Sequence, residues 1–198
     1  MGLDERIGNR YLKAGIGYGG ACFPKDTRAL VFQAKQHNYN LLTVGSTIAV
    51  NEKQKVKLIE RSRKYYKTFN NLNIAILGTT FKPNTDDLRE APSLENISIL
   101  INEGANVKIF DPISEDSIKR LYGNKIIYCD SIEQALYDSD ICFIYTEWDV
   151  IKTMNKNLFK KLMKKPIVLD GRNCFKVTEI PVGITYESIG RPVINTSK

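Results

Sequence analysis

The chain has 198 residues, a net charge of +7, and 42% apolar and 26% charged residues. That length can bury a substantial core in one large or two small domains, and the composition is that of an ordinary globular protein. No apolar run approaches the about 20 residues that span a membrane, and MGLDERIGNR lacks the apolar core of a signal peptide. We therefore expect a cytoplasmic protein with no membrane partner.

The positive charge favours an anionic partner but does not choose between nucleic acid, a membrane and phosphorylated metabolites. The lysine cluster at Lys160, Lys161, Lys164 and Lys165 is typical of a solvated helix face. No nucleic-acid-binding motif accompanies it, so we expect a small phosphorylated ligand and no nucleic acid.

Cysteine and histidine usage narrows the chemistry. The four cysteines form no C-x-x-C pair, and the chain has one histidine, His37. A zinc site and a histidine-based triad are both hard to build from this set, so we expect no metal. Cytosolic redox conditions favour free thiols over disulfides.

Residues 1–68 predict a mostly helical region. One helix follows Pro24, and a second runs from about Thr43 to Tyr66, with apolar residues roughly in phase on one face. The stretch TFNNLN is typical of a connector.

From residue 73 onward, short apolar strands alternate with helices. The predicted strands are NIAILG, NVKIFDP, NKIIYC, DICFIYT, KPIVLDG and, as a last edge strand, GITYESIG; the predicted helices are APSLENISILINEG and SIEQALYDS. This alternation is typical of a parallel sheet with helical crossovers. The fold class that follows is α/β, with a helical segment before a doubly wound parallel sheet.

Ligands of such sheets bind beyond the carboxyl ends of the strands. After Gly78, TTFKPNTDDLRE forms a long irregular segment at one such end, and loops of about 12 residues inside compact domains are often functional. The alternative is a solvated loop in which Arg89 pairs with Asp86 or Asp87.

GIGYGGACFPKD contains G-x-G-x-x-G at Gly15, Gly17 and Gly20. A dinucleotide fingerprint needs a strand before these glycines and a helix directly after them. NRYLKA is not a convincing buried strand, and ACFPKD intervenes before the helix. We interpret the match as accidental.

The same segment suits a reactive Cys22. Glycines let the backbone approach a ligand closely and take positive φ angles, and Pro24 suits the first helical position, which places Phe23 near the N-cap and Cys22 just before it. A helix N-terminus and the nearby Lys25 favour a thiolate, and Asp26 in the first turn can hold a water or a proton. The alternative is a buried structural cysteine. Cys129, Cys142 and Cys174 lie in apolar settings typical of inert core residues.

The segment GIGYGGACFPKDTRAL resembles the active-site segment of UDP-glucose 6-dehydrogenases, and ILGTTFKPNTDDLREAPSL resembles the nucleotide-sugar segment of the same family. GLDERIG, NEKQK, VKIFDP, TEWD and LDGR fall in the family's order and spacing. The resemblance covers nearly the whole chain. GDP-mannose dehydrogenases are the nearest relatives, and the strings FPKD and FKPNTDD favour the UDP-glucose branch.

The resemblance implies a helical dimerisation region over residues 1–68 and a Rossmann-like UDP-sugar-binding domain over residues 73–198. It implies oxidation of UDP-glucose to UDP-glucuronate with two NAD. Cys22 would hold the sugar aldehyde as a thiohemiacetal and then as a thioester, and Asp26 would assist water activation and proton transfer.

Binding roles are also implied by the resemblance alone. The positions that match substrate-binding residues are Arg6 (from the neighbouring subunit), Tyr11, Leu12, Lys13, Ala14, Gly15, Gly19 and Lys82. Lys25 and Arg89 match positions that contact NAD from outside its own domain, and Arg172 is a further candidate to approach the substrate. The expected partners are UDP-glucose and a second copy through the central helix, with a separately encoded N-terminal half left open.

The sequence departs from the family in one large respect. Nothing in it resembles the N-terminal NAD-binding domain or the first part of the central helical region, so we expect little or no dehydrogenase activity from the isolated chain. Ala21 stands where serine is common, and Thr79-Thr80 where apolar residues are common. A non-catalytic module that binds a nucleotide sugar or dimerises stays open as an alternative, and a nucleic-acid-binding basic protein is a third reading.

Overall fold

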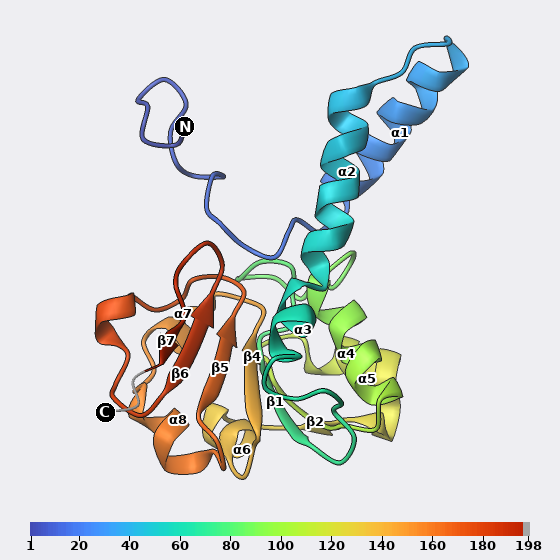
Figure 1. The fold of residues 1–198 in the computed structure, drawn as a ribbon. Coiled ribbons are helices and arrows are strands. Elements are labelled where there is room, and N and C mark those ends of the chain that lie inside the picture. The colour runs from blue at the N-terminus through green and yellow to red at the C-terminus, as the bar shows by residue number, and fades with distance from the viewer. Residues whose placement is uncertain (196–198) are drawn as a thin grey trace.

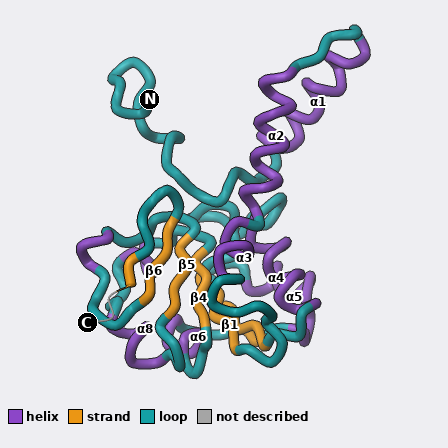
Figure 2. The backbone as a smooth tube through the Cα atoms, in the orientation of Figure 1, coloured by secondary structure: helices purple, strands orange, loops and turns teal. Residues whose placement is uncertain are grey.

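The computed structural model describes residues 1–195, which form a sheet-based body and a projecting pair of helices (Figures 1 and 2). Residues 1–21 contain no helix or strand and lead to α1 (Cys22–Gln36). The chain then turns back through α2 (Leu42–Lys55), so that α1 and α2 form a helical hairpin, and α3 (Lys57–Ser62) enters the body. No helix among the described residues is long and apolar enough to cross a membrane.

The predicted single helix from Thr43 to Tyr66 is wrong. The helix breaks at Val56, where φ is −92° and ψ is 6°, and α3 ends at Ser62. The break separates two environments: α3 buries Leu58 and Ile59 in the sheet core, whereas most of α2 projects into solvent. Two helices that bury differently oriented faces do not fit one straight axis.

Seven strands form one sheet, in the order β3-β2-β1-β4-β5-β6-β7. Their bounds are β1 Asn73–Leu77, β2 Asn106–Phe110, β3 Ile127–Tyr128, β4 Ile141–Ile144, β5 Ile167–Asp170, β6 Thr185–Ser188 and β7 Ile194–Asn195. The first six are parallel, and β7 runs antiparallel to β6. The GITYESIG segment is therefore a strand, as predicted, but not the edge, because β7 pairs outside it.

Helices cover both faces of the sheet. The crossovers are α4 (Pro92–Asn102), α5 (Glu115–Tyr122), α6 (Ile132–Leu136), α7 (Asp149–Lys152) and α8 (Asn157–Leu162), with short 3₁₀ turns at Gly123–Lys125 and Val177–Glu179. Ile74 and Ile76 of β1 pack into the core under α3, α4 and α5, whereas Ala75 and Leu77 pack into the core under α6, α7 and α8. Successive side chains of a strand point to opposite faces, so this division confirms the doubly wound α/β fold. The sequence reading did not predict α5.

The centre of the sheet is the place where the winding direction changes. β1 lies between β2 and β4, and the chain leaves β1 at Gly78, where φ is +78°. A Cβ added at Gly78 would lie 2.5 Å from Thr146 Cβ and 2.9 Å from Thr146 N. Only glycine satisfies both the backbone angle and this close approach. The long loop over residues 78–91, called the β1–α4 loop below, therefore starts at the switch point where ligands of such sheets bind.

We expect Gly78→Ala to destabilise the fold through both strain and overlap. Gly123→Ala is a matched control, because Gly123 also has positive φ (+52°) but its added Cβ meets nothing within 4 Å. Urea unfolding should show a loss of about 3 kcal/mol or more for Gly78→Ala and about 1–2 kcal/mol for Gly123→Ala. Equal losses would show that the contact with Thr146 does not matter.

Candidate functional site

The segment over residues 15–22, called the cysteine segment below, lies across the carboxyl edge of the sheet. Ile16 is fully buried in the core, and its side chain packs against Gly171, where an added Cβ would lie 2.8 Å from Ile16 Cγ2. At its other end, the amide of Gly20 donates to the carbonyl of Arg89 over 2.7 Å. The fold thus brings the cysteine segment, the β1–α4 loop and the end of β5 together.

The glycines of this segment are required by contacts within the protein. A Cβ at Gly17 (φ +92°) would lie 2.5 Å from Asn51 Oδ1, and one at Gly19 would lie 2.5 Å from the carbonyl oxygen of Glu90. At Gly20 (φ +83°) it would lie 2.9 Å from the ring of Phe81. No strand precedes them. The missing strand agrees with the interpretation of G-x-G-x-x-G as accidental, but the expectation that ACFPKD intervenes before the helix is wrong, because α1 begins at Cys22. The close approach expected for a ligand is made first by protein atoms.

Two amide side chains of α2 hold the cysteine segment from the hairpin side. Asn51 accepts a hydrogen bond from the amide of Tyr18 (2.8 Å) and donates to the carbonyl of Tyr18 (3.1 Å). Gln54 donates to the carbonyl of Gly15 over 2.7 Å. The sequence reading missed both residues. Their spacing of three in NEKQK, which puts two amides on one helix face, is the signal that could have found them.

Arg172 holds three backbone segments from inside the protein. Its guanidinium donates to the carbonyls of Tyr145 (2.9 Å), Phe81 (2.9 Å) and Gly17 (3.4 Å). Burial lowers its pKa, and Glu147, with Oε2 3.5 Å from Nε, counteracts that effect. In this chain Arg172 therefore fixes the geometry of the carboxyl edge, and several of its five donors are already used.

Cys22 is the first residue of α1. We predicted that the helix would start at Pro24, but it starts two residues earlier, at Cys22. The N-cap residue Ala21 makes no side-chain hydrogen bond to the helix. Pro24 is tolerated as the third helical residue because the first four amides of a helix lack intrahelical acceptors. Asp26 consequently lies in the second turn rather than the first. It is four residues from Cys22, which puts both on the same helix face.

The surroundings of Cys22 are exposed and charged. Its thiol lies in an exposed residue, close enough to Arg89 for a thiolate there to raise the pKa of the guanidinium, although hydrogen bonding to Asp87 contributes more. Arg89 donates to Asp87 from Nε (2.9 Å) and Nη2 (2.8 Å), as the solvated-loop alternative anticipated. Lys25 pairs with Asp26, with Nζ 3.4 Å from Oδ1.

Other predicted substrate residues do not converge within one chain. Arg6 pairs with Asp4 over 2.8 Å and is exposed, and Tyr11 is 90% exposed. The N-terminal loop lies well apart from the hairpin in Figure 1. Leu12, Lys13 and Ala14 are also exposed. Gly15 and Gly19, by contrast, are held against the body by the contacts described above.

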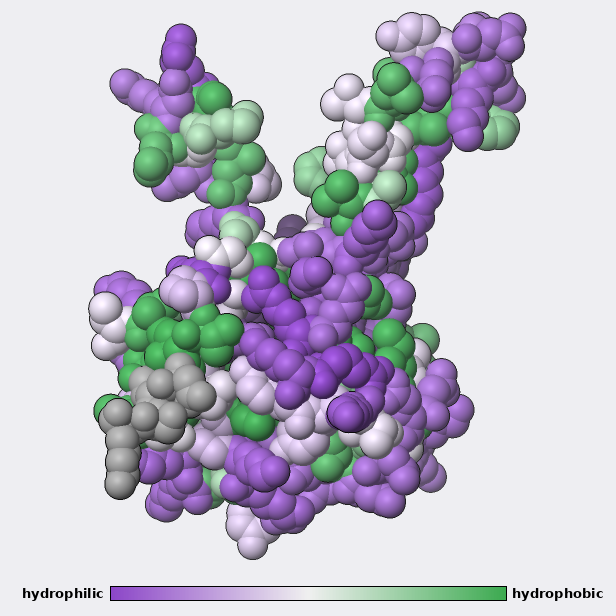
Figure 3. Space-filling model, viewed as in Figure 1, coloured by the Kyte–Doolittle hydropathy of each residue, from purple (hydrophilic) through white to green (hydrophobic). Residues whose placement is uncertain are grey.

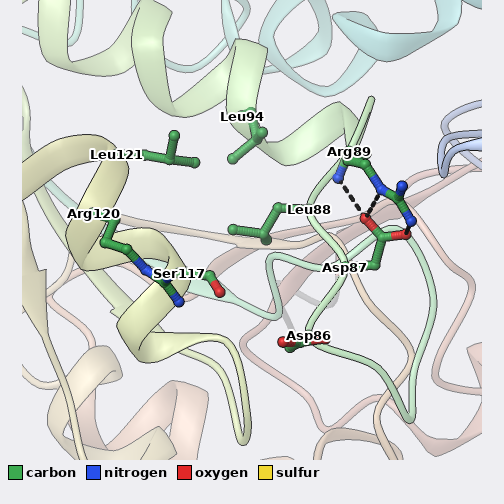
Figure 4. Close-up of a pocket in the computed structure, with 8 residues that line it drawn as sticks. All are labelled: Asp86, Asp87, Leu88, Arg89, Leu94, Ser117, Arg120 and Leu121. Atoms are coloured by element: carbon green, nitrogen blue, oxygen red, sulfur yellow. Dashed lines mark hydrogen bonds and ion pairs between the residues drawn. The ribbon is translucent and has the colours of Figure 1, made fainter.

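The β1–α4 loop carries the remaining predicted residues and borders a cavity. Lys82 is exposed, with Nζ 5.3 Å from the ring centre of Phe81. On the far side of the loop lies an open cavity of about 580 Å³ (Figure 4). Its lining residues are Asp86, Asp87, Leu88, Arg89, Leu94, Ser117, Arg120 and Leu121. In Figure 4 the leucines point towards its centre, whereas the Arg89 side chain turns to Asp87.

A charged network ties the β1–α4 loop to both helices of the hairpin. Glu90 accepts from Arg28 of α1 (2.9 Å) and from Lys55 of α2 (2.9 Å), and Lys55 also pairs with Glu52 (3.1 Å). Arg28, and then Lys55, lower the pKa of Glu90 to about 2. Burial alone would lower the pKa of Lys55, but Glu90 and Glu52 outweigh burial and raise it. The network is therefore ionised at neutral pH.

The remaining cysteines differ from Cys22 in their surroundings. Burial raises the pKa of the thiols of Cys129, Cys142 and Cys174. Among residues 1–195, no cluster of three or more metal-ligating side chains is present.

Comparison with known proteins defines the class first. Residues 75–177 match the model of the UDP binding domain of the UDP-glucose/GDP-mannose dehydrogenase family, and residues 1–53 match its central domain. These two matches define the class as nucleotide-sugar dehydrogenases. The chain belongs to the UDP-glucose/GDP-mannose dehydrogenase family. We predicted one region over residues 1–68 and another over residues 73–198, of which the last three lie outside the described part. The predicted boundary, at residues 68–73, lies between the two matched ranges.

Individual relatives agree with this assignment. The chain is 42% identical over 195 residues to UDP-glucose 6-dehydrogenase TuaD of Bacillus subtilis, covering 98% of this chain and 42% of that protein. It superposes on a UDP-glucose dehydrogenase of Pyrobaculum islandicum with a TM-score of 0.82 and 30% identity, covering 94% of this chain and 41% of the other. It superposes on a GDP-mannose dehydrogenase of Pseudomonas aeruginosa with a TM-score of 0.73 and 25% identity, covering 92% of this chain and 42% of the other. The chain thus spans less than half the length of the relatives it matches.

The stability contributed by Glu90 should depend on pH. Because the pKa of Glu90 in the folded protein (about 2) lies below its ordinary value of 4.5, its interactions stabilise the fold above pH 4.5 and are lost as pH falls towards 2. Glu90→Gln should lower the free energy of unfolding by about 1–2 kcal/mol at pH 7, after allowance for solvent screening, and by less between pH 4.5 and 2. Urea unfolding of the native chain and of Glu90→Gln between pH 7 and pH 2 measures this difference in the free energy of unfolding.

The matched control is Glu60→Gln, which removes an exposed pair with Lys57. It should change little at any pH. A loss for Glu90→Gln that does not vary with pH would contradict the assignment of the effect to the carboxylate.

Proposed function

We propose that this chain supplies the cysteine helix and the UDP-sugar-binding domain of a UDP-glucose 6-dehydrogenase. The observation that carries the proposal is the position of Cys22. It is an exposed residue at the start of a helix, held beside Arg89 at the carboxyl edge of a domain of the UDP-binding type. The 42% identity to the UDP-glucose enzyme TuaD supports UDP-glucose as the sugar nucleotide.

The proposed chemistry uses Cys22 as a nucleophile towards the C6 aldehyde of the sugar. The thiolate forms a C–S bond to C6, and the aldehyde oxygen takes a proton to give a thiohemiacetal. Loss of a hydride from C6 and of the hydroxyl proton leaves a thioester. Water then attacks C6, the C–S bond breaks, and a carboxylate and the free thiol result. A thiolate suits both steps, because it attacks carbonyl carbon readily and is a good leaving group.

Asp26 is the group proposed to move protons in this sequence. It lies one turn after Cys22 on the same face of α1, at a distance where a bridging water can reach both. A carboxylate in this position can accept a proton from water.

Substrate binding is assigned to the carboxyl edge of the sheet. Lys82 provides an exposed cation on the β1–α4 loop, the backbone of Gly19 is fixed beside that loop, and Gly15 lies against Gly171 and Arg172. Such cations complement a diphosphate. Tyr11, Leu12, Lys13 and Ala14 extend the same segment, and Arg6 is proposed to serve a neighbouring subunit.

Lys25 and Arg89 would be the residues of this chain that contact NAD. Both are exposed and lie next to the cysteine, which fits a diphosphate group there, although each has a carboxylate partner that it must share or leave. When bound, NAD accepts the hydride in both oxidations. Its main binding site is not proposed within the described residues, so we expect no dehydrogenase activity from the 198-residue chain alone.

The alternative is a module that binds a nucleotide sugar without chemistry. The match to a UDP binding domain, which can hold a nucleotide without chemistry, favours it. The two functions differ in one respect: the module does not need Cys22.

The test joins this chain to the N-terminal half of TuaD. We expect the joined protein to form NADH from UDP-glucose, and Cys22→Ser to reduce this rate by about 100-fold or more. Cys174→Ser is the control and should retain activity, because a hydroxyl can replace a thiol that donates to Asp170. Calorimetry on the unjoined chain should show UDP-glucose binding that Cys22→Ala leaves unchanged and that Lys82→Ala weakens about tenfold. Full activity of Cys22→Ser would leave only the binding module.

We further propose that the helical hairpin pairs with a second copy of the chain. Within α1 only Pro24 is buried, and hydrophobic side chains run along the hairpin surface in Figure 3. Its exposed large apolar residues are Phe23, Leu30, Phe32, Tyr39, Leu42 and Val50. α2 covers its own domain only near its end, at the buried Asn51 and Lys55.

Sedimentation velocity tests this arrangement. We expect a dimer for the native chain and a monomer for Val50→Asp, because an ionised carboxylate in an apolar interface costs several kcal/mol. Val182→Asp is the matched control, since Val182 is equally exposed (63% against 64%) but lies outside the hairpin. A monomeric native chain would contradict the proposal and with it the role of Arg6 in the neighbouring subunit.

A further inference from the structure

Glu90 combines three features that no neighbouring residue shares. It has φ of +54°, where the other non-glycine residues with positive φ in the described chain are asparagine or aspartate. Its carboxylate binds Arg28 and Lys55, and its carbonyl oxygen faces Gly19 so closely that no Cβ fits between them. A glutamate in the left-handed region is strained and persists only where its surroundings hold it.

Arg89 and Glu90, which are consecutive residues of the β1–α4 loop, contact the chain before and after Cys22. The Arg89 carbonyl accepts from the amide of Gly20, two residues before Cys22, while the Arg89 side chain bonds to Asp87. The Glu90 carboxylate then reaches α1 at Arg28, six residues after Cys22. Cys22 is therefore held from both sides by consecutive residues of the β1–α4 loop.

The geometry points to Glu90 as a positioning residue for the reactive cysteine: its carboxylate fixes α1 to the β1–α4 loop and so keeps Cys22, at the start of α1, against that loop. This inference rests on the proposed use of Cys22 as the nucleophile. Glu90 itself touches no reacting atom. Its partner Lys55 is 6% exposed, so the connection is shielded from solvent on the hairpin side.

Glu52 supplies a matched control. It carries the same charge and pairs with the same two cations, Arg28 at 3.4 Å and Lys55 at 3.1 Å, but it belongs to α2 and makes no connection to the β1–α4 loop. Glu52→Gln thus removes one negative charge near α1 without cutting the link that Glu90 makes.

The first measurement is hydrogen exchange on the full chain. In Glu90→Gln the amide of Gly20 should exchange about tenfold faster or more, because its bond to Arg89 opens more often. In Glu52→Gln it should change less than twofold. The amides of Ile76 and Phe143, in the central strands, report the global loss of stability expected for Glu90→Gln, and the acceleration at Gly20 should exceed theirs. Equal protection of Gly20 in the native chain and Glu90→Gln overturns the inference, and so does equal loss in Glu52→Gln.

The second measurement is the rate of Cys22 alkylation by iodoacetamide at pH 7, followed by mass spectrometry. If Glu90 positions the cysteine, Glu90→Gln should slow alkylation about threefold or more, because the helix start that carries Cys22 is no longer held in place. If Glu90 acts only through its charge, removal of a nearby anion should speed alkylation instead, which contradicts the inference. Arg28→Gln should reproduce the slowing, and the double variant should add nothing to it.

Both measurements are independent of turnover. Loss of NADH formation in Cys22→Ser tests the proposed function, whereas Gly20 exchange and the direction of the alkylation change test the placement of the cysteine. Should Cys22 prove dispensable while Glu90→Gln still releases Gly20, the proposed function fails and the structural link stands.

Discussion

The site depends on the absence of Cβ atoms where the cysteine segment crosses the sheet. At Gly19 and Gly20 the backbone lies so near to Glu90 and Phe81 that a methyl group would overlap them. This approach lets the amide of Gly20 bond to the loop, and the helix that begins at Cys22 then starts at the carboxyl edge of the sheet. Close packing of two backbones thus places Cys22 at the position where doubly wound folds bind ligands.

The β1–α4 loop has two kinds of contact in consequence. Outward, Lys82 and Arg89 present cations to solvent, which suits an anionic ligand. Inward, Glu90 and the carbonyls of Phe81 and Arg89 bind groups of the helical region and of the sheet edge. A loop held in this way needs little regular structure of its own. Its order comes from buried polar contacts, which are costly to break when one partner is removed.

Much of the fold could be predicted from the sequence because hydrophobic periodicity and strand–helix alternation are local signals. They gave β1 to β6, α4 and α6, and the doubly wound sheet. They failed at α5, whose amphipathic pattern is strong but covers only eight residues, and at Val56, where the need to bury Leu58 and Ile59 against the sheet breaks the helix. The start of α1 was missed by two residues because proline is compatible with several positions of a first turn.

By itself the sequence determined the fold class, the family resemblance and the identity of the candidate groups, since these follow from residue type and order along the chain. Only the tertiary structure decided what those groups contact. It showed that the glycines of the cysteine segment pack against Asn51, Glu90 and Phe81. It also showed that Arg172 donates its hydrogen bonds to backbone carbonyls, and that the N-terminal loop lies apart from the hairpin that carries the cysteine. The physical reason is distance along the chain. Asn51 and Tyr18 are 33 residues apart and Arg172 and Gly17 are 155 apart, and no local pattern records contacts between such residues.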